Sequence, residues 1–128
     1  MIAKITTGVK IVVETNFQEK VSNPLFDQYI FAYRITIENF NEFPVQLISR
    51  HWYIFDSIAG KHEIEGEGVV GAKPVLFQDA NYQYISGCNL KSDFGTMHGY
   101  YVFENIRTSE TFKVEIPRFQ LASSSKTN

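Results

Sequence analysis

The chain has 128 residues, a formal net charge of −2, 44% hydrophobic residues and a single cysteine. This length predicts one domain, residues 1–128, which is large enough to bury a hydrophobic core of its own. The acidic balance and the lack of a basic run argue against a protein that binds nucleic acid through its phosphates. One cysteine excludes an intramolecular disulfide, and no stretch reaches the 18 apolar residues of a membrane-spanning helix.

Hydrophobic and polar residues alternate in one segment after another, which is the period of a half-buried β-strand. Between 29 and 39, for example, Phe31, Tyr33 and Ile35 share one face, whereas Arg34 and Thr36 lie on the other. Short turns rich in Gly, Asn, Asp or Pro separate these segments, and no segment has a helical period over ten residues. In chain order, the expected strands are 9–17, 29–39, 45–55, 62–65, 74–77, 82–90, 96–105 and 111–119.

About seven or eight short strands joined by short turns predict an all-β protein, either an antiparallel sandwich or a barrel. Segment 45–55 is apolar on both faces and is therefore expected near the centre of a sheet. The C-terminal tail, residues 118–128, ends in a polar stretch and is expected to be partly disordered. The N-terminus has no apolar signal sequence, and together with the lone cysteine this predicts a cytoplasmic protein.

The stretch GEGVVG, residues 66–71, spells the G-x-G-x-x-G pattern of dinucleotide-binding loops. In those loops a buried strand precedes the motif, and a helix follows whose N-terminus binds the phosphates. Here a charged segment precedes it, Pro74 follows it closely, and Glu65 and Glu67 would repel a phosphate. We therefore expect a structural role for the glycines, with a phosphate or pyrophosphate site or a partner contact as alternatives. The residues concerned are Gly66, Glu67, Gly68, Val69, Val70 and Gly71.

The region 62–71 also contains a group of acidic residues. Glu63, Glu65 and Glu67 occupy alternate positions and share one face if the strand continues through them. Carboxylate oxygens bind hard divalent cations, so these three residues are candidates for a metal site. The alternative is a solvated edge strand whose charges prevent aggregation, and we expect that role.

Arg50, His51 and Trp52 form the densest polar and aromatic triplet of the sequence. In a strand, His51 points to the side opposite Arg50 and Trp52. Trp52 is expected to anchor the core, while the alternative places Arg50 on an open sheet face as an interaction residue. Cys88 is expected to be a small buried hydrophobic residue and not a nucleophile. No catalytic constellation is recognisable.

Several blocks of the chain, in order, resemble the ApaG family of small bacterial proteins. The blocks are YIFAYRITIEN, PVQLISRHWYIFD, EGEGVVGAKPVL, YQYISG, GTMHGYY and IPRF, between Phe26 and Phe119. One departure lies in the turn before YQYISG, where the family usually has Pro-Gly and this chain has Gln78 and Asp79. The resemblance implies an immunoglobulin-like, fibronectin type III-like β-sandwich with the glycine motif in a loop.

The resemblance also implies no established catalytic activity, an association with cobalt resistance and magnesium efflux, and related domains in proteins where an interaction role is natural. We therefore expect a non-enzymatic interaction module without a cofactor. The expected partner is a protein, with no nucleic acid and no membrane, and the chain itself is expected to be a monomer or a weak homodimer. The alternative is a protein that binds a phosphate group or a divalent cation at 62–71.

Overall fold

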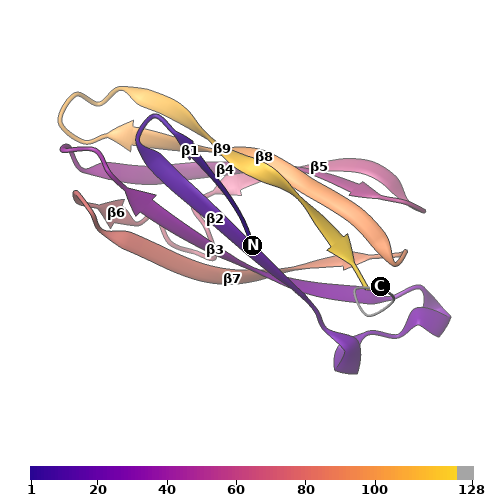
Figure 1. The fold of residues 1–128 in the computed structure, drawn as a ribbon. Coiled ribbons are helices and arrows are strands. Elements are labelled where there is room, and N and C mark those ends of the chain that lie inside the picture. Colours follow the sequence, from indigo (N-terminus) through magenta and orange to yellow (C-terminus); the bar gives the residue numbers. More distant parts are fainter. Residues whose placement is uncertain (124–128) are drawn as a thin grey trace.

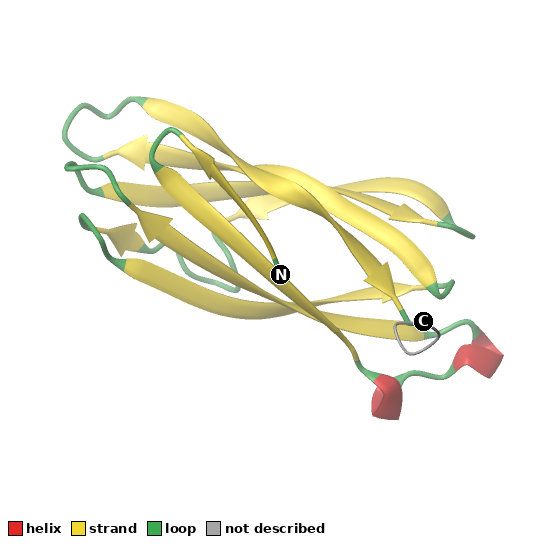
Figure 2. Ribbon diagram, viewed as in Figure 1, coloured by secondary structure: helices red, strands yellow, loops and turns green. Residues whose placement is uncertain are grey.

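The computed structural model describes residues 1–123, and strands make up most of that length (Figure 2). Two single-turn 3₁₀ helices, Glu19–Val21 and Pro24–Phe26, lie at one end of the molecule. No helix in the described part of the chain has the length and hydropathy of a membrane span. The strands are β1 (Ile2–Thr6), β2 (Val9–Phe17), β3 (Tyr29–Asn39), β4 (Val45–Asp56), β5 (Gly60–Glu67), β6 (Val75–Leu76), β7 (Asn81–Leu90), β8 (Phe94–Asn105) and β9 (Thr111–Ala122).

Each of the eight expected segments contains a strand, which confirms the all-β fold. The strand that the periodicity did not reveal is β1, at the edge of its sheet. Ile2 and Ile5 of β1 are exposed, so no buried face distinguishes it in the sequence. Of the tail expected to be partly disordered, residues 118–122 belong to β9, and residues 124–128 lie outside the described part.

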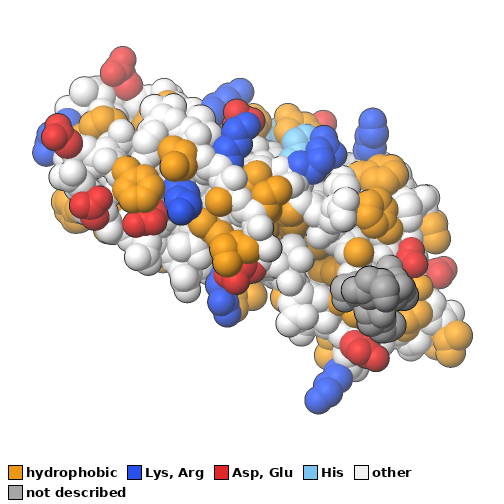
Figure 3. All heavy atoms as spheres, in the orientation of Figure 1, with side chains coloured by type: hydrophobic (Ala, Val, Ile, Leu, Met, Phe, Trp, Pro, Cys, Tyr) orange, Lys and Arg blue, Asp and Glu red, His pale blue; other side chains and the backbone are white. Residues whose placement is uncertain are grey.

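Two antiparallel sheets pack face to face as a sandwich (Figure 1). One has the order β1-β2-β3-β7, and the other has the order β5-β4-β8-β9 with β6 beside β4. On one side of the sandwich β1 lies against β9, where Lys4 Nζ is 3.0 Å from a carboxylate oxygen of Glu115. On the face drawn in Figure 3, acidic, basic and hydrophobic side chains are interspersed.

Alternate residues of both sheets fill the space between them. The rings of Tyr33, Trp52 and Phe119 meet there, with centroids 5.4 Å apart for Tyr33 and Trp52 and 5.9 Å apart for Trp52 and Phe119. Trp52 is only 2% exposed, which confirms the expected core anchor. The buried hydroxyls of Tyr84 and Tyr101 hydrogen-bond to each other across the two sheets.

A β-bulge in β4 changes which side chains of that strand face the core. The pairing with β8 skips one residue between Leu47 and Ser49, so Ile48 is an extra residue. Odd-numbered positions are buried before the bulge and even-numbered positions are buried after it. As a result, Arg50 faces the space between the sheets and His51 faces the opposite, outer surface.

Candidate functional site

The guanidinium of Arg50 lies on Gly66, which is its pairing partner in β5. A Cβ at position 66 would stand 2.9 Å from Nη2, so glycine provides the room that the guanidinium occupies. Nη1 donates hydrogen bonds to the carbonyl oxygens of Glu67 at 3.0 Å and Gly68 at 2.9 Å. Arg50 therefore holds the end of β5 against β4, and Gly66 has a structural reason to be glycine.

The second half of the glycine motif is a tight turn. The backbone N–H groups of Val69 and Ala72 donate to each other's carbonyl oxygens at 2.8 and 2.9 Å. The central residues, Val70 and Gly71, have φ angles of +47° and +77°, as in the type I′ turns of hairpins. Gly68 also has a positive φ, and a Cβ there would stand 2.4 Å from the carbonyl oxygen of Ala72. Backbone geometry thus accounts for both glycines.

The two valines of this turn have opposite environments. Val69 is 0% exposed and belongs to the core, whereas Val70 is 66% exposed. Val69 therefore cannot contact a partner on the folded protein, and Val70 remains as the accessible apolar residue of the motif. The N–H groups of Gly68 and Val69 already donate to the carbonyls of Ile48 and Ala72, so they are not free to bind a phosphate.

Glu63, Glu65 and Glu67 lie at alternate positions of β5, and they engage two different partners. Oε2 of Glu63 lies 2.8 Å from Nε2 of His51, and Oε2 of Glu65 lies 3.1 Å from its Nδ1. Glu67 lies 2.6 Å from Lys73 Nζ, and the hydrogen bond and charge of that lysine lower the pKa of the Glu67 carboxyl. Residues 1–123 contain no group of three His, Cys, Asp or Glu side chains that could hold a metal ion.

Aromatic and imidazole rings cover the outer surface of β4 and β8. His51 stacks on Tyr100 with centroids 5.1 Å apart, and Tyr53 stacks on His98 at 5.0 Å. His51 and Tyr53 are themselves 4.7 Å apart, so the four rings form a continuous row. All are half-buried. We call this surface the outer aromatic face, and it consists of His51, Tyr53, Phe55, His98 and Tyr100.

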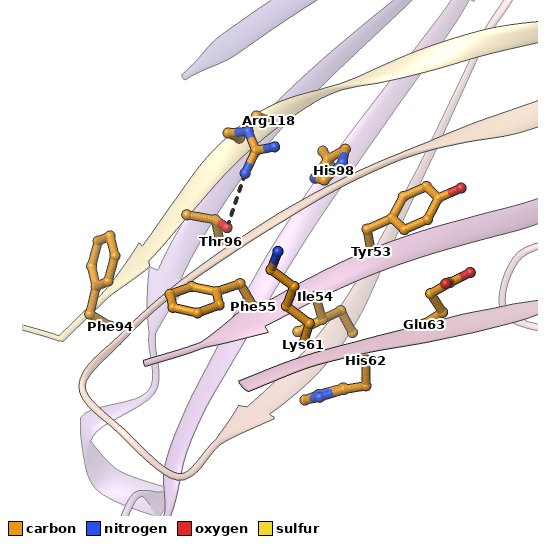
Figure 4. A pocket seen from close by; sticks show the side chains of 10 residues that line it. All are labelled: Tyr53, Ile54, Phe55, Lys61, His62, Glu63, Phe94, Thr96, His98 and Arg118. Atoms are coloured by element: carbon orange, nitrogen blue, oxygen red, sulfur yellow. Dashed lines mark hydrogen bonds between the residues drawn. The ribbon is translucent and has the colours of Figure 1, made fainter. Parts of the chain in front are cut away.

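A groove of about 640 Å³ lies over one end of the outer aromatic face (Figure 4). Tyr53, Phe55 and His98 line it together with Phe94 and the charged side chain of Arg118. The Nδ1 atom of His98 is buried and has no hydrogen-bond partner among the described residues. Burial, and then the charge of Arg118, lower the pKa of His98, so the imidazole is uncharged at neutral pH.

A second cavity, of about 480 Å³, opens between the sheets where β5 and β7 form their edges. We call it the edge cleft, and Arg50, Tyr33, Ser86 and Cys88 are among the residues that line it. Burial, and then the charge of Asp56, raise the pKa of the Cys88 thiol to about 11. Cys88 is therefore a protonated thiol at neutral pH, and its burial agrees with the small buried hydrophobic residue expected from the sequence.

The sequence predicts only some of the residues that form these surfaces. The alternative that puts Arg50 on an open sheet face is wrong, because the bulge in β4 turns this side chain into the edge cleft. The open face instead carries His51, Tyr53 and Tyr100, which were not among the expected site residues. The sequence does carry a signal for this face. Rings occupy alternate positions of β4, at His51, Tyr53 and Phe55, and of β8, at His98 and Tyr100.

Comparison with known proteins agrees with the blocks that the sequence shares with ApaG proteins. A family model described as the ApaG domain matches residues 19–105. Protein ApaG of Brucella suis biovar 1 is 40% identical over 121 residues, which cover 94% of this chain and 92% of that protein. Protein ApaG of Vibrio campbellii is 44% identical over 114 residues, covering 89% and 90%. A crystal structure of an ApaA protein from Bordetella pertussis has a TM-score of 0.84 and 37% identity over 94% of each chain. The chain therefore belongs to the ApaG family.

Proposed function

We propose that this protein is a non-enzymatic interaction module that binds a protein partner through the outer aromatic face. The observation that carries the proposal is the row of stacked rings on a surface where antiparallel sandwiches usually have polar side chains. Tyr and Arg are enriched among the residues that dominate binding energy at interfaces. Here Tyr53 and Arg118 line the same groove.

Charged side chains of both signs border this face. On the β9 side, Lys113 Nζ lies 4.4 Å from the centroid of the Tyr100 ring, and Arg118 lines the groove. On the β5 side, Glu63 and Glu65 contact His51. An apolar centre with a charged rim is the usual anatomy of a protein interface. The partner is therefore expected to carry acidic groups opposite β9 and basic groups opposite β5.

The strand order supports the fibronectin type III-like reading of the fold. By chain order, β2-β3-β7 and β4-β8-β9 correspond to the A-B-E and C-F-G strands of immunoglobulin-like sandwiches. A fold does not by itself give a function, so the proposal rests on the face and not on this likeness. The three glutamates of β5 are already paired, Glu63 and Glu65 with His51 and Glu67 with Lys73. On this proposal, the family's association with cobalt resistance and magnesium efflux therefore arises through the partner and not through a metal ion bound by these glutamates.

The test is affinity capture with the purified protein, followed by calorimetry with each captured protein after it has been purified separately. Tyr53→Ser removes one of the two inner rings of the row and should weaken binding at least tenfold, because interface aromatics commonly contribute more than about 1.4 kcal/mol. Ile85→Ser is the matched control, since Ile85 is an exposed apolar residue, 59% accessible, on the other sheet. It should leave the affinity unchanged.

Both variants should unfold within a few degrees of the parent protein, because neither position is fully buried. If a partner binds the Tyr53→Ser variant as tightly as the parent, it does not bind through the outer aromatic face, and the proposal is wrong. Equal weakening by Ile85→Ser would show that the effect is not specific to this face.

A further inference from the structure

We propose that the edge cleft binds a small organic monocarboxylate, whose carboxylate pairs with Arg50 and whose apolar part lies against Trp52 and Ile64. This site is separate from the outer aromatic face, because it lies on the opposite surface of β4. It does not depend on the proposed protein interaction. It also differs from a phosphate site in the glycine loop, because the recognising group is a side chain between the sheets.

The guanidinium of Arg50 has unused donors. Nη1 donates to the carbonyls of Glu67 and Gly68, but Nε and Nη2 donate to no other group in residues 1–123, and Arg50 forms no ion pair there. His98 Nδ1 is the sole buried side-chain nitrogen or oxygen of the described residues without a partner, so Nε and Nη2 of Arg50 are not fully buried. These two atoms form the edge of the guanidinium that pairs bidentately with carboxylates.

The backbone holds this guanidinium in place before any ligand arrives. The bulge at Ile48 directs Arg50 into the cleft, Gly66 leaves the space that it fills, and two carbonyls fix one of its nitrogens. Preorganisation of this kind reduces the entropy that binding would otherwise cost. A half-buried cation without a carboxylate partner also gains from an anion that enters its site.

The walls of the cleft suit the rest of such a ligand. Trp52 and Ile64 provide apolar surface, and the hydroxyl-bearing residues Tyr33 and Ser86 lie on the opposite sheet. Burial raises the pKa of the Tyr33 phenol, while a hydrogen bond with Ser86 and the nearby Arg50 charge oppose that rise, so the phenol remains protonated at neutral pH. No Asp or Glu among the described residues lines the cleft.

Charge and size define the ligand class. One guanidinium balances one negative charge, which favours a monocarboxylate over a phosphate monoester that carries close to two charges at neutral pH. A volume of about 480 Å³ lies in the usual range of small-molecule sites. Phenylacetate is a suitable probe, because it joins a carboxylate to an apolar ring, and phenylacetamide is its neutral counterpart.

The experiment is a titration of ¹⁵N-labelled protein followed by NMR. Phenylacetate should shift the Arg50 Nε–H signal and the amides of Ser86 and Cys88 saturably, and phenylacetamide should not. Arg50→Gln should weaken binding at least tenfold. Arg50→Lys should also weaken it, because lysine keeps the charge but cannot pair bidentately with a carboxylate. Arg34→Gln is the matched control for the loss of one positive charge, since Arg34 lies exposed on β3, 3.8 Å from Glu14.

A further variant, Ile64→Trp, fills the cleft from its exposed edge and leaves Arg50 in place, so it should abolish binding even if Arg50→Gln fails to fold. A peptide ending in a free carboxylate, acetyl-Gly-Gly-Phe, is titrated beside phenylacetate to distinguish a chain terminus from a free acid as the source of the carboxylate. The proposal is overturned if no probe gives saturable shifts at about 20 mM, which would detect even millimolar affinity, if phenylacetamide binds equally, or if Arg50→Gln and Ile64→Trp bind like the parent.

Discussion

The guanidinium of Arg50 occupies the space that a side chain would take at Gly66, its partner in the neighbouring strand. This relationship gives the first glycine of the G-x-G-x-x-G pattern a purpose unrelated to nucleotides. It also joins β4 and β5, the two strands whose residues form one wall of the edge cleft. The energetic link between the two residues can therefore be measured directly.

Gly66→Ala should destabilise the protein by about 1–2 kcal/mol. The new Cβ displaces the flexible guanidinium, which then loses its charge-assisted hydrogen bonds to the carbonyls of Glu67 and Gly68. If this is the cause, Arg50→Ala should cost less in the Gly66→Ala background than in the parent, with a coupling energy of about 1 kcal/mol. Urea unfolding of the four proteins measures the cycle, and strictly additive costs would contradict this explanation.

Serine substitutions should separate the two valines of the turn. Val69→Ser removes buried methyl groups and places a hydroxyl in the core, which should cost about 2–4 kcal/mol of unfolding free energy. Val70→Ser changes an exposed side chain and should stay within about 0.5 kcal/mol of the parent. Chemical denaturation of each single variant provides the comparison. Similar losses at both positions would show that the turn does not bury one valine and expose the other.

Val70→Asn should stabilise the protein by about 1 kcal/mol. A β-branched residue is strained at a φ of +47°, whereas asparagine tolerates this backbone and Asn-Gly is the preferred centre of a type I′ turn. The melting temperature should rise by about 3–5 °C. Val75→Asn serves as the control, because Val75 is an exposed valine in the extended backbone of β6, and this change should give no such gain.

Asp56 should make stability depend on acidic pH. Burial disfavours its charged form, but N–H groups of Lys91 and Ile58 and the hydroxyl of Ser92 donate to it at 2.6, 3.0 and 2.7 Å and hold its pKa below the ordinary value. Since the folded pKa lies below the unfolded value of about 3.9, this stabilisation is complete well above pH 3.9. It is lost as the pH falls below that value and through the folded pKa.

Asp56→Asn tests this dependence. At pH 7 the variant should be less stable than the parent by about 2–3 kcal/mol, because a buried, hydrogen-bonded carboxylate has been replaced. The difference should shrink as the pH is lowered from 5 to 3, because protonation removes from the parent the Asp56 carboxylate that the variant already lacks. Urea unfolding at pH 7, 5, 4 and 3 measures it. A constant difference over this range would assign the loss to packing and not to ionisation.

The strand periodicity predicted the core well wherever one face was apolar and the other polar. Phe31, Tyr33 and Ile35 are buried as expected, since nothing interrupts the alternation of β3. The phase of β4 was harder to predict, because Leu47 and Ile48 are both apolar and either could face the core. Hydrophobicity alone therefore does not reveal the bulge at Ile48.

The candidate sites depend on features that lie between strands. The alternation of Glu63 and Glu65 was visible in the sequence, but their shared contact with His51 requires the register between β4 and β5. The contact between the Arg50 guanidinium and Gly66 depends on that same register. Local sequence patterns report the period of a strand but not its alignment with a neighbour, so they could not bring these residues together.

The extra residue at position 48 has a consequence for the whole of β4. Leu47 pairs with Phe103 and Arg50 pairs with Tyr101, and both partners are buried, so a strand with Ile48 deleted would alternate without a bulge and keep Arg50 and Trp52 on the core side. A strand that kept Ile48 but lost the bulge would instead alternate strictly from Leu47, so that His51 and Tyr53 would face the core and Arg50 and Trp52 would face solvent. The bulge thus determines the two candidate binding surfaces jointly, and neither can be reversed without reversing the other.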